Sequence, residues 1–269
     1  MSPDRRPRTV LDLVAMKADR RRIAMLTCYD AAFARLIGPE VDVLLVGDSV
    51  QQVVAGHDST LGATLEQLIY HADAVRRGSP GSLVVVDLPF LSYQVSIEDA
   101  IRNAGRVLQA SGAQAVKLEG GAPMVPTVRA LVERGVPVLG HLGLLPQSVH
   151  ALGGYRVQGR DPEHAARMLE DARALETAGA FGVVLELVPA TVAARISGSL
   201  TVPTVGIGAG GGCDGQVLVL HDMLGLNEAF NPKFLKRYAS LGETVRAAAR
   251  QFAAEVHEGS YPGPEHSFE

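Results

Sequence analysis

The chain has 269 residues, of which 47% are hydrophobic and 20% charged, with a formal net charge of -4. This composition is typical of a globular protein, and the negative charge together with only 5% aromatic residues argues against a nucleic-acid partner. No apolar run approaches the roughly 20 residues that span a bilayer, and the charged start of the chain does not resemble a signal peptide, so we expect a cytoplasmic protein without a membrane partner.

Short apolar runs alternate with amphipathic stretches along the whole chain. Buried parallel strands are expected at residues 23–27, 43–46, 83–86, 115–118, 136–139, 182–185, 204–207 and 216–220. Helices are expected at residues 30–37, 65–77, 97–110, 124–134, 162–178 and 190–196. Eight strands that alternate with helices predict a closed (β/α)8 TIM barrel of the α/β class.

Residues that typically cap helices stand at the expected helix ends. They are Thr64, Ser96 and Asp161 at the starts and Gly112 and Gly179 at the stops. The stretch 208–215, between the last two strands, is too short and too rich in glycine for an ordinary crossover helix. We therefore expect that helix to be degenerate.

The chain is expected to form a single barrel domain over residues 1–269, because no linker rich in Pro, Ser or charge interrupts the pattern. Residues 9–17 are expected to form an N-terminal helix that caps the bottom of the barrel, and residues 234–256 a long C-terminal helix. Residues 1–8 and 258–269 are expected to be flexible. Cysteine is scarce, so the thiols are expected to be free.

Four of the apolar runs end at or just before an acidic residue: Asp48, Asp87, Glu119 and Glu186. In a barrel, the carboxyl ends of the strands form the face where ligands bind. Carboxylates gathered from separate strands repel one another and acquire raised pKa values unless a cation shares the site. No His or Cys stands at a matching spacing, so the expected cation is a hard divalent ion such as Mg2+.

Asp48 and Asp87 follow consecutive strands, and neighbouring strands lie about 4.8 Å apart, so both side chains can reach one ion. Glu119 would contribute directly or through a water molecule. Each acid taken alone is equally consistent with a helix cap or a turn. Three acids at successive strand ends favour a metal site.

Four further features have two interpretations each. Lys117 faces the barrel lumen with Glu119, and it either supplies positive charge to an anionic substrate or forms a structural ion pair with Glu119. Glu186 either removes a proton from carbon as a general base or pairs with an Arg or caps a turn. His141 either donates to a ligand oxygen or is packed within the protein. The glycine-rich loop 206–212 either holds an anion on its backbone N–H groups or is a tight turn.

Seven short motifs follow one another along nearly the whole chain. They occupy residues 27–30, 47–49, 116–121, 140–147, 153–159, 206–210 and 213–216. Together and in this order they closely resemble the ketopantoate hydroxymethyltransferase family. One departure is visible, because the family usually continues after Gly47-Asp48-Ser49 with Leu-Gly-Met, whereas this chain has Val50-Gln51-Gln52. The larger residues can alter the pocket floor or the access of folate, but they leave the charged set intact.

The resemblance implies a barrel of the phosphoenolpyruvate mutase and isocitrate lyase type, assembled as a homo-oligomer, typically a decamer. It implies an enzyme of pantothenate and coenzyme A biosynthesis. The expected reaction transfers a hydroxymethyl group from 5,10-methylenetetrahydrofolate to 3-methyl-2-oxobutanoate through a Mg2+-stabilised enolate and gives 2-dehydropantoate. Its partners would be small molecules, namely the 2-oxo acid and the folate.

The resemblance also implies roles for individual residues. The metal ligands fall on Asp48 and Asp87, with Glu119 in the same cluster. The contacts to the oxo acid fall on Asp48, Ser49, Asp87 and Lys117. The general base falls on Glu186, and the histidine that contacts the substrate falls on His141. In the expected chemistry, Lys117 and His141 would share the developing oxyanion charge.

Two other functions remain open at this point. The first is another Mg2+-dependent carbon–carbon lyase or mutase of the phosphoenolpyruvate mutase type, acting on a 2-oxo acid, because enolate stabilisation is common to both chemistries. The second is a barrel retained only for binding or assembly. The intact set of charged residues argues against the second.

Overall fold

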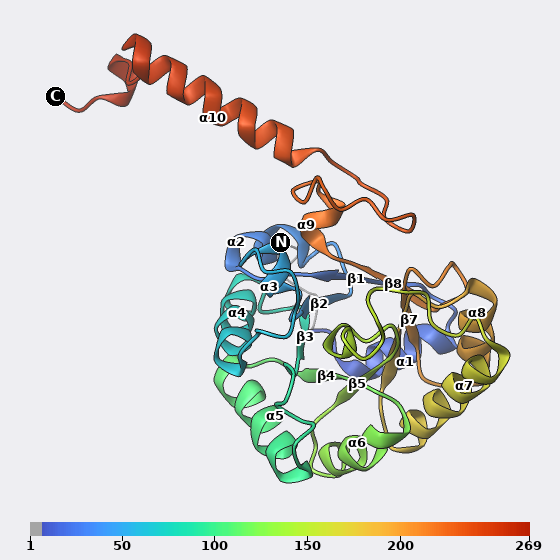
Figure 1. The fold of residues 1–269 in the computed structure, drawn as a ribbon. Coiled ribbons are helices and arrows are strands. Elements are labelled where there is room, and N and C mark those ends of the chain that lie inside the picture. The colour runs from blue at the N-terminus through green and yellow to red at the C-terminus, as the bar shows by residue number, and fades with distance from the viewer. Residues whose placement is uncertain (1–6) are drawn as a thin grey trace. The chain divides into compact units, whose positions relative to one another are not determined.

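The computed structural model of the chain describes residues 7–269, and in this range eight parallel strands close into a barrel (Figure 1). They are β1 (Ile23–Thr27), β2 (Val43–Val46), β3 (Leu83–Asp87), β4 (Ala115–Glu119), β5 (Val138–Gly143), β6 (Gly182–Glu186), β7 (Thr204–Ile207) and β8 (Gly215–Leu218). The strands lie in chain order, and β8 pairs with β1 to close the barrel. The predicted (β/α)8 barrel is confirmed.

Helices follow most of the strands and surround the barrel (Figure 1). The α-helices are α1 (Val10–Ala18), α2 (Ala31–Ile37), α3 (Val50–Val53), α4 (Leu65–Gly78), α5 (Ile97–Ser111), α6 (Val125–Val132), α7 (Pro162–Thr177), α8 (Ala190–Ser199), α9 (Leu220–Met223) and α10 (Leu241–Glu258). Three short 3-10 helices are η1 (Ala122–Met124), η2 (Pro146–Ser148) and η3 (Pro264–His266).

Two predicted boundaries were wrong by several residues. The fifth strand was expected to end at residue 139, but β5 continues through two glycines to Gly143, which pairs with Glu186 of β6. Gly140 within it is tightly packed, since a Cβ atom there would lie 3.0 Å from the Leu175 side chain. The long C-terminal helix is present, but it begins at Leu241 rather than at residue 234.

The predicted helix caps are confirmed. The side-chain oxygens of Thr64, Ser96 and Asp161 accept hydrogen bonds from the backbone N–H groups three residues later. Each such cap is worth about 1 kcal/mol because it satisfies a donor that the helix itself cannot use. Gly112 and Gly179 follow α5 and α7 with φ values of 69° and 100°, a backbone conformation that favours glycine.

The strands alternate between two hydrophobic layers. Side chains in the lumen, such as Met25 of β1 and Val85 of β3, form one cluster with Leu13 and Met16 of α1. The remaining side chains of the strands pack outward against the surrounding helices in a second, larger cluster. The N-terminal helix therefore closes one end of the lumen as predicted, and the polar face lies at the other end.

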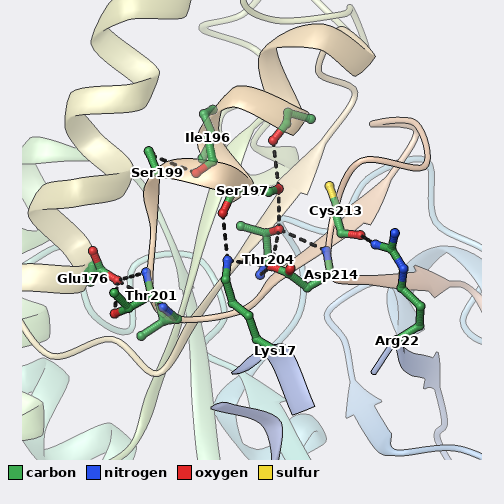
Figure 2. A network of polar contacts seen from close by, with 12 residues as sticks. Lys17, Arg22, Glu176, Ile196, Ser197, Ser199, Thr201, Thr204, Cys213 and Asp214 are labelled. Atoms are coloured by element: carbon green, nitrogen blue, oxygen red, sulfur yellow. Dashed lines mark hydrogen bonds and ion pairs between the residues drawn. The ribbon is translucent and has the colours of Figure 1, made fainter. Parts of the chain in front are cut away.

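The connection from β7 to β8 contains no helix, as the sequence predicted, and a polar network holds it in place (Figure 2). The carboxylate of Asp214 accepts hydrogen bonds at 2.8 Å from both Lys17 of α1 and the backbone N–H of Thr204. The hydroxyl of Thr204 shares a hydrogen bond of 2.6 Å with Ser197 of α8. These contacts join the capping helix α1 and the helix α8 to the starts of the last two strands.

The chain divides into two compact units, one that extends to Val219 and one that comprises Leu220–Glu269. The first is the barrel, and the second contains α9 and α10. The single domain expected over residues 1–269 stays a prediction. So does the flexibility expected of residues 1–8 and 258–269, of which residues 1–6 lie outside the described part of the chain.

The structure also bears on the cysteines and on the expected lack of a membrane-spanning segment. Cys28 and Cys213 are both buried free thiols, as predicted. Across the described residues, no helix combines the length and the apolar character needed to cross a membrane.

Candidate active site

Every predicted site residue lies at the carboxyl ends of the strands. Asp48 and Ser49 follow β2, Asp87 ends β3, Lys117 and Glu119 lie on β4, His141 lies on β5, and Glu186 ends β6. Because all the strands are parallel, these side chains share one end of the barrel. Glu186 and Ser49 are partly exposed, and the other five are buried. The barrel thus collects the residues from five neighbouring strands.

A buried ion pair joins β3 to β4. The Nζ atom of Lys117 lies 2.6 Å from Oδ1 of Asp87, while the backbone N–H of Asp48 donates to Oδ2 of Asp87 at 3.1 Å. Burial alone would lower the pKa of Lys117, but Asp87, Glu119 and Asp48 outweigh it and raise that pKa above its ordinary value. Lys117 is therefore a fixed positive charge, and the carboxylate that it binds is Asp87.

Asp48 has a strongly raised pKa. It is 4% exposed, and its burial, followed by the charges of Asp87 and Glu119, raises its pKa to about 8. The repulsion that the sequence predicted for gathered carboxylates is thus present at this residue. A divalent cation beside such a carboxylate would stabilise its ionised form.

The acids of this site fit a hard cation bound through few protein ligands. Within residues 7–269, no three His, Cys, Asp or Glu side chains are grouped so as to hold a metal ion by themselves. Mg2+ is commonly bound by one or two carboxylates and takes its other ligands from water and substrate. Asp48 and Asp87 are buried and directly linked, so they fit that pattern. Glu119 lies beside them, and its Oε2 atom accepts from the backbone N–H of Gln147 at 3.0 Å.

His141 lies between two carboxylates from neighbouring strands. Its Nδ1 atom is 3.6 Å from Oε1 of Glu119, and its Nε2 atom is 3.3 Å from Oε2 of Glu186. Burial and Lys117 lower the pKa of His141, but these two acids outweigh both effects and raise it to about 9. Neither ring nitrogen makes a hydrogen bond of good geometry. His141 is consequently a cationic side chain whose ring nitrogens can donate to an oxygen atom of a ligand.

Sequence reasoning assigned no role to Gln147 or Tyr93, although both belong to the site. Gln147 is buried and donates its side-chain amide to Oδ2 of Asp48 at 2.9 Å. Tyr93 is 1% exposed and accepts from the backbone N–H of Glu119 at 3.0 Å. Gln147 ends the motif that begins at residue 140, and that position was the only feature of the sequence that could have pointed to a role in the site. Tyr93 stands in a loop whose sequence contains no such feature.

The residues that depart from the family pattern form the short helix α3. Gln51 is buried, and its amide donates to the side chain of Gln67 at 2.7 Å. Gln52 donates to the hydroxyl of Tyr155 at 3.1 Å, which joins α3 to the loop after β5. Neither glutamine bonds to a carboxylate of the site. The departure therefore leaves the charged residues of the site as they are.

The glycine-rich loop after β7 is tightly packed against α8. A Cβ atom at Gly210 would lie 2.5 Å from that of Ala190, and one at Gly212 would lie 2.6 Å from that of Ala194. Gly210 also has a φ of 75°, which side chains rarely adopt. Packing and backbone geometry thus account for these glycines without a bound anion.

Comparison with known proteins adds a family match over almost the whole chain. The family described as ketopantoate hydroxymethyltransferase matches residues 7–264. A protein of Pelobacter propionicus named 3-methyl-2-oxobutanoate hydroxymethyltransferase is 53% identical over 269 residues, which is all of both chains. A protein of the same name from Heliobacterium modesticaldum is 55% identical over 254 residues, covering 94% of this chain and 92% of that protein.

Solved structures with similar folds are much more distant in sequence. Phosphonopyruvate hydrolase in complex with oxalate and Mg2+ has a TM-score of 0.63 and 12% identity, covering 96% of this chain and 93% of its own. A 2,3-dimethylmalate lyase of the PEP mutase/isocitrate lyase superfamily has a TM-score of 0.58 and 17% identity, covering 95% and 92% respectively. At these identities the likeness concerns the fold alone.

Proposed function

The chain belongs to the ketopantoate hydroxymethyltransferase family, and we propose that it transfers a hydroxymethyl group from 5,10-methylenetetrahydrofolate to 3-methyl-2-oxobutanoate. The product would be 2-dehydropantoate, an intermediate of pantothenate and coenzyme A biosynthesis. The observation that carries this proposal is the agreement over the full chain with relatives that bear this enzyme's name. The arrangement of charged groups at the barrel end supports the chemistry.

The charge balance of the site supports a divalent cation. When ionised, the four acids Asp48, Asp87, Glu119 and Glu186 outnumber the two cationic side chains, Lys117 and His141, and the excess would repel an anionic oxo acid. We propose that Asp48 and Asp87 hold Mg2+, with Glu119 in the same cluster directly or through water. When bound, Mg2+ supplies a Lewis acid that stabilises negative charge on the keto oxygen of the substrate.

Residues of the chain itself bind the oxo acid, remove its proton and stabilise the negative charge that develops. Lys117, held by Asp87, supplies fixed positive charge toward the oxo acid, and Ser49 offers a hydroxyl oriented by its 2.8 Å hydrogen bond to Tyr29. Glu186 is partly open to solvent at the rim of this set and acts as the base that removes the proton from C3. His141, beside Glu186, donates to the oxygen on which negative charge develops.

The overall change balances with one molecule of water. Loss of the C3 proton lets that carbon form a bond to the methylene carbon of the folate. The methylene carbon is bonded to two nitrogens of the folate, and both carbon–nitrogen bonds break. Water supplies the hydroxyl group of the product, and its remaining proton together with the proton removed from C3 protonates the two folate nitrogens. Tetrahydrofolate is released. The charged residues described above all act on the oxo acid, and none of them is assigned to the folate.

The rival lyase or mutase function is not favoured. The relatives at 53% and 55% identity are named as the hydroxymethyltransferase, whereas the solved lyase and hydrolase are 17% and 12% identical. A shared fold supports many reactions, so the closer sequence relationship decides.

We propose a cytoplasmic enzyme whose partners are small molecules, and a homo-oligomer, for which the family resemblance predicts a decamer. A mass measurement in solution would test the subunit number.

One assay tests the proposed function. Purified full-length protein with Mg2+, 3-methyl-2-oxobutanoate and 5,10-methylenetetrahydrofolate should form 2-dehydropantoate, and chelation of the metal should stop the reaction. Cleavage of the oxo acid without folate would favour a lyase. No turnover of any 2-oxo acid would favour a barrel that only binds or assembles.

A further inference from the structure

Gln147 occupies a central place among the acids of the site. It lies in η2, directly after β5, and is 5% exposed. Its backbone N–H donates to Oε2 of Glu119 at 3.0 Å, and its side-chain amide donates to Oδ2 of Asp48 at 2.9 Å. One residue thus bonds to carboxylates that come from β4 and from the loop after β2, on either side of Asp87.

The side chain of Gln147 is itself fully bonded. Its amide nitrogen also donates to the backbone oxygen of Leu88 at 2.9 Å, and its amide oxygen accepts from the hydroxyl of Tyr93 at 2.8 Å and from Gln94 at 3.1 Å. The carbonyl of Leu88 can only accept, so the amide cannot be turned the other way round. Both donors and both acceptor positions are used, which locks the orientation of the side chain.

Tyr93 links the side chain of Gln147 to Glu119. Its hydroxyl accepts from the backbone N–H of Glu119 at 3.0 Å and donates its single proton toward the amide oxygen of Gln147. Glu119 is therefore held through both its backbone and its carboxylate. Because Gln147 is neutral, it fixes the acids without neutralising them and leaves their charge for a cation.

We propose that Gln147, oriented by Tyr93, is a positioning residue that fixes the carboxylates of Asp48 and Glu119 for Mg2+. This inference rests on the proposed function for the identity of the cation. Outer partners of metal ligands typically change metal affinity about 10- to 100-fold when they are removed, because the free protein no longer holds its ligands in place.

The test is a calorimetric titration of metal-free, full-length protein with Mg2+ alone and, in parallel, with Mn2+ alone. Gln147→Met keeps the volume of the side chain and removes the side-chain hydrogen bonds, including the one to Asp48, while the backbone bond to Glu119 remains. It should weaken metal binding about 10- to 100-fold. Tyr93→Phe removes only the hydroxyl, and with it the hydrogen bonds to Gln147 and to the backbone N–H of Glu119. It should weaken metal binding about 3- to 10-fold, since neutral hydrogen bonds contribute less than charged ones and the metal ligands themselves stay in place.

A matched control comes from the opposite end of the barrel. Gln114 also binds the backbone, since its side chain accepts from the N–H of Val84 at 2.9 Å, but it touches no residue of the site. Gln114→Met should lower the thermal midpoint without a change in metal affinity. If Gln147 contributes only to stability, Gln147→Met and Gln114→Met should both leave the metal affinity unchanged.

A second readout separates positioning from general damage. In Gln147→Met the C3 exchange rate of 3-methyl-2-oxobutanoate should return to within about threefold of wild type at saturating Mg2+, with the half-saturating Mg2+ concentration raised about as much as the metal Kd. Metal affinity within twofold of wild type would overturn the inference, and if Gln147→Met does not fold, the same result for Tyr93→Phe would do so. The titrations need no folate or oxo acid. A wild-type protein that binds Mg2+ without hydroxymethyl transfer would therefore contradict the proposed function and leave the role of Gln147 to be decided by its variants.

Discussion

The Nε2 atom of His141 lies 3.3 Å from the Oε2 atom of Glu186. The other ring nitrogen faces Glu119, so this imidazole, on β5, lies between the proposed base on β6 and an acid of the proposed metal site on β4. Its pKa of about 9 keeps it charged at neutral pH. The proposed donor to the substrate and the proposed base are therefore adjacent.

Replacement of His141 by Asn should lower the turnover number about 100-fold, because a charged donor to the developing oxyanion is lost. The wild-type rate should fall as the pH rises through about 9, where His141 loses its proton. The variant should lack this alkaline decrease. Rates of product formation between pH 6 and 10 would check both, and an unchanged alkaline decrease in His141→Asn would assign it to another group.

The metal-free protein should lose stability as the pH rises from 5 to 9. Asp48 has a folded pKa of about 8 against an ordinary value of 3.8, so its stabilising contribution is complete below 3.8 and is lost as the pH rises toward 8. His141, at about 9 against 6.5, acts in the same direction between those values. Each proton contributes at most about 1.4 kcal/mol per pH unit.

Chemical denaturation of metal-free protein at several pH values measures this effect. Asp48→Asn has nearly the same shape and cannot ionise, so its stability should depend less on pH between 5 and 8. Mg2+ should stabilise the wild-type protein more at pH 8 than at pH 6, since the cation favours the ionised carboxylate. Equal pH dependence of the variant and the wild type would exclude Asp48 as the source.

Gly143→Ala should destabilise the protein by about 3 kcal/mol or more, through backbone strain and a direct clash. Gly143 has a φ of 96°, and an added Cβ atom would lie 2.2 Å from the backbone oxygen of Glu186. Gly153 is a matched control, because it has a φ of 68° and a Cβ atom there would meet nothing within 4 Å. Gly153→Ala should cost only about 1 to 2 kcal/mol. Urea denaturation would separate them, and equal losses would contradict the close approach of β5 to β6.

Much of the barrel was predictable because short apolar runs and helix caps are local signals. The runs that became β1, β2 and β7 have the predicted bounds, and Thr64 caps α4 as expected. The extension of β5 to Gly143 was missed, since glycine disfavours strands unless a neighbour packs closely against it. Leu175 and Glu186, the residues that pack against the glycines of β5, are distant in the sequence, so only the folded structure identifies them.

The acids of the site were predictable from their place after apolar runs, because parallel strands bring all such residues to one end. The hydrogen-bond and ion-pair partners of these acids were not predictable from the sequence. Lys117 was expected to pair with Glu119 if it formed an ion pair, but it binds Asp87, and the roles of Gln147 and Tyr93 depend on loops that meet only in three dimensions.

The exchange of the C3 hydrogen of 3-methyl-2-oxobutanoate with deuterated water tests the central claim most directly, because it isolates the proton removal and needs no folate. Wild-type protein with Mg2+ should exchange the hydrogen, and chelation should abolish the exchange. Glu186→Gln should still bind Mg2+ and the oxo acid, yet exchange at least about 100-fold more slowly. Exchange at the wild-type rate in Glu186→Gln, or undiminished exchange in the absence of the metal, would contradict the account.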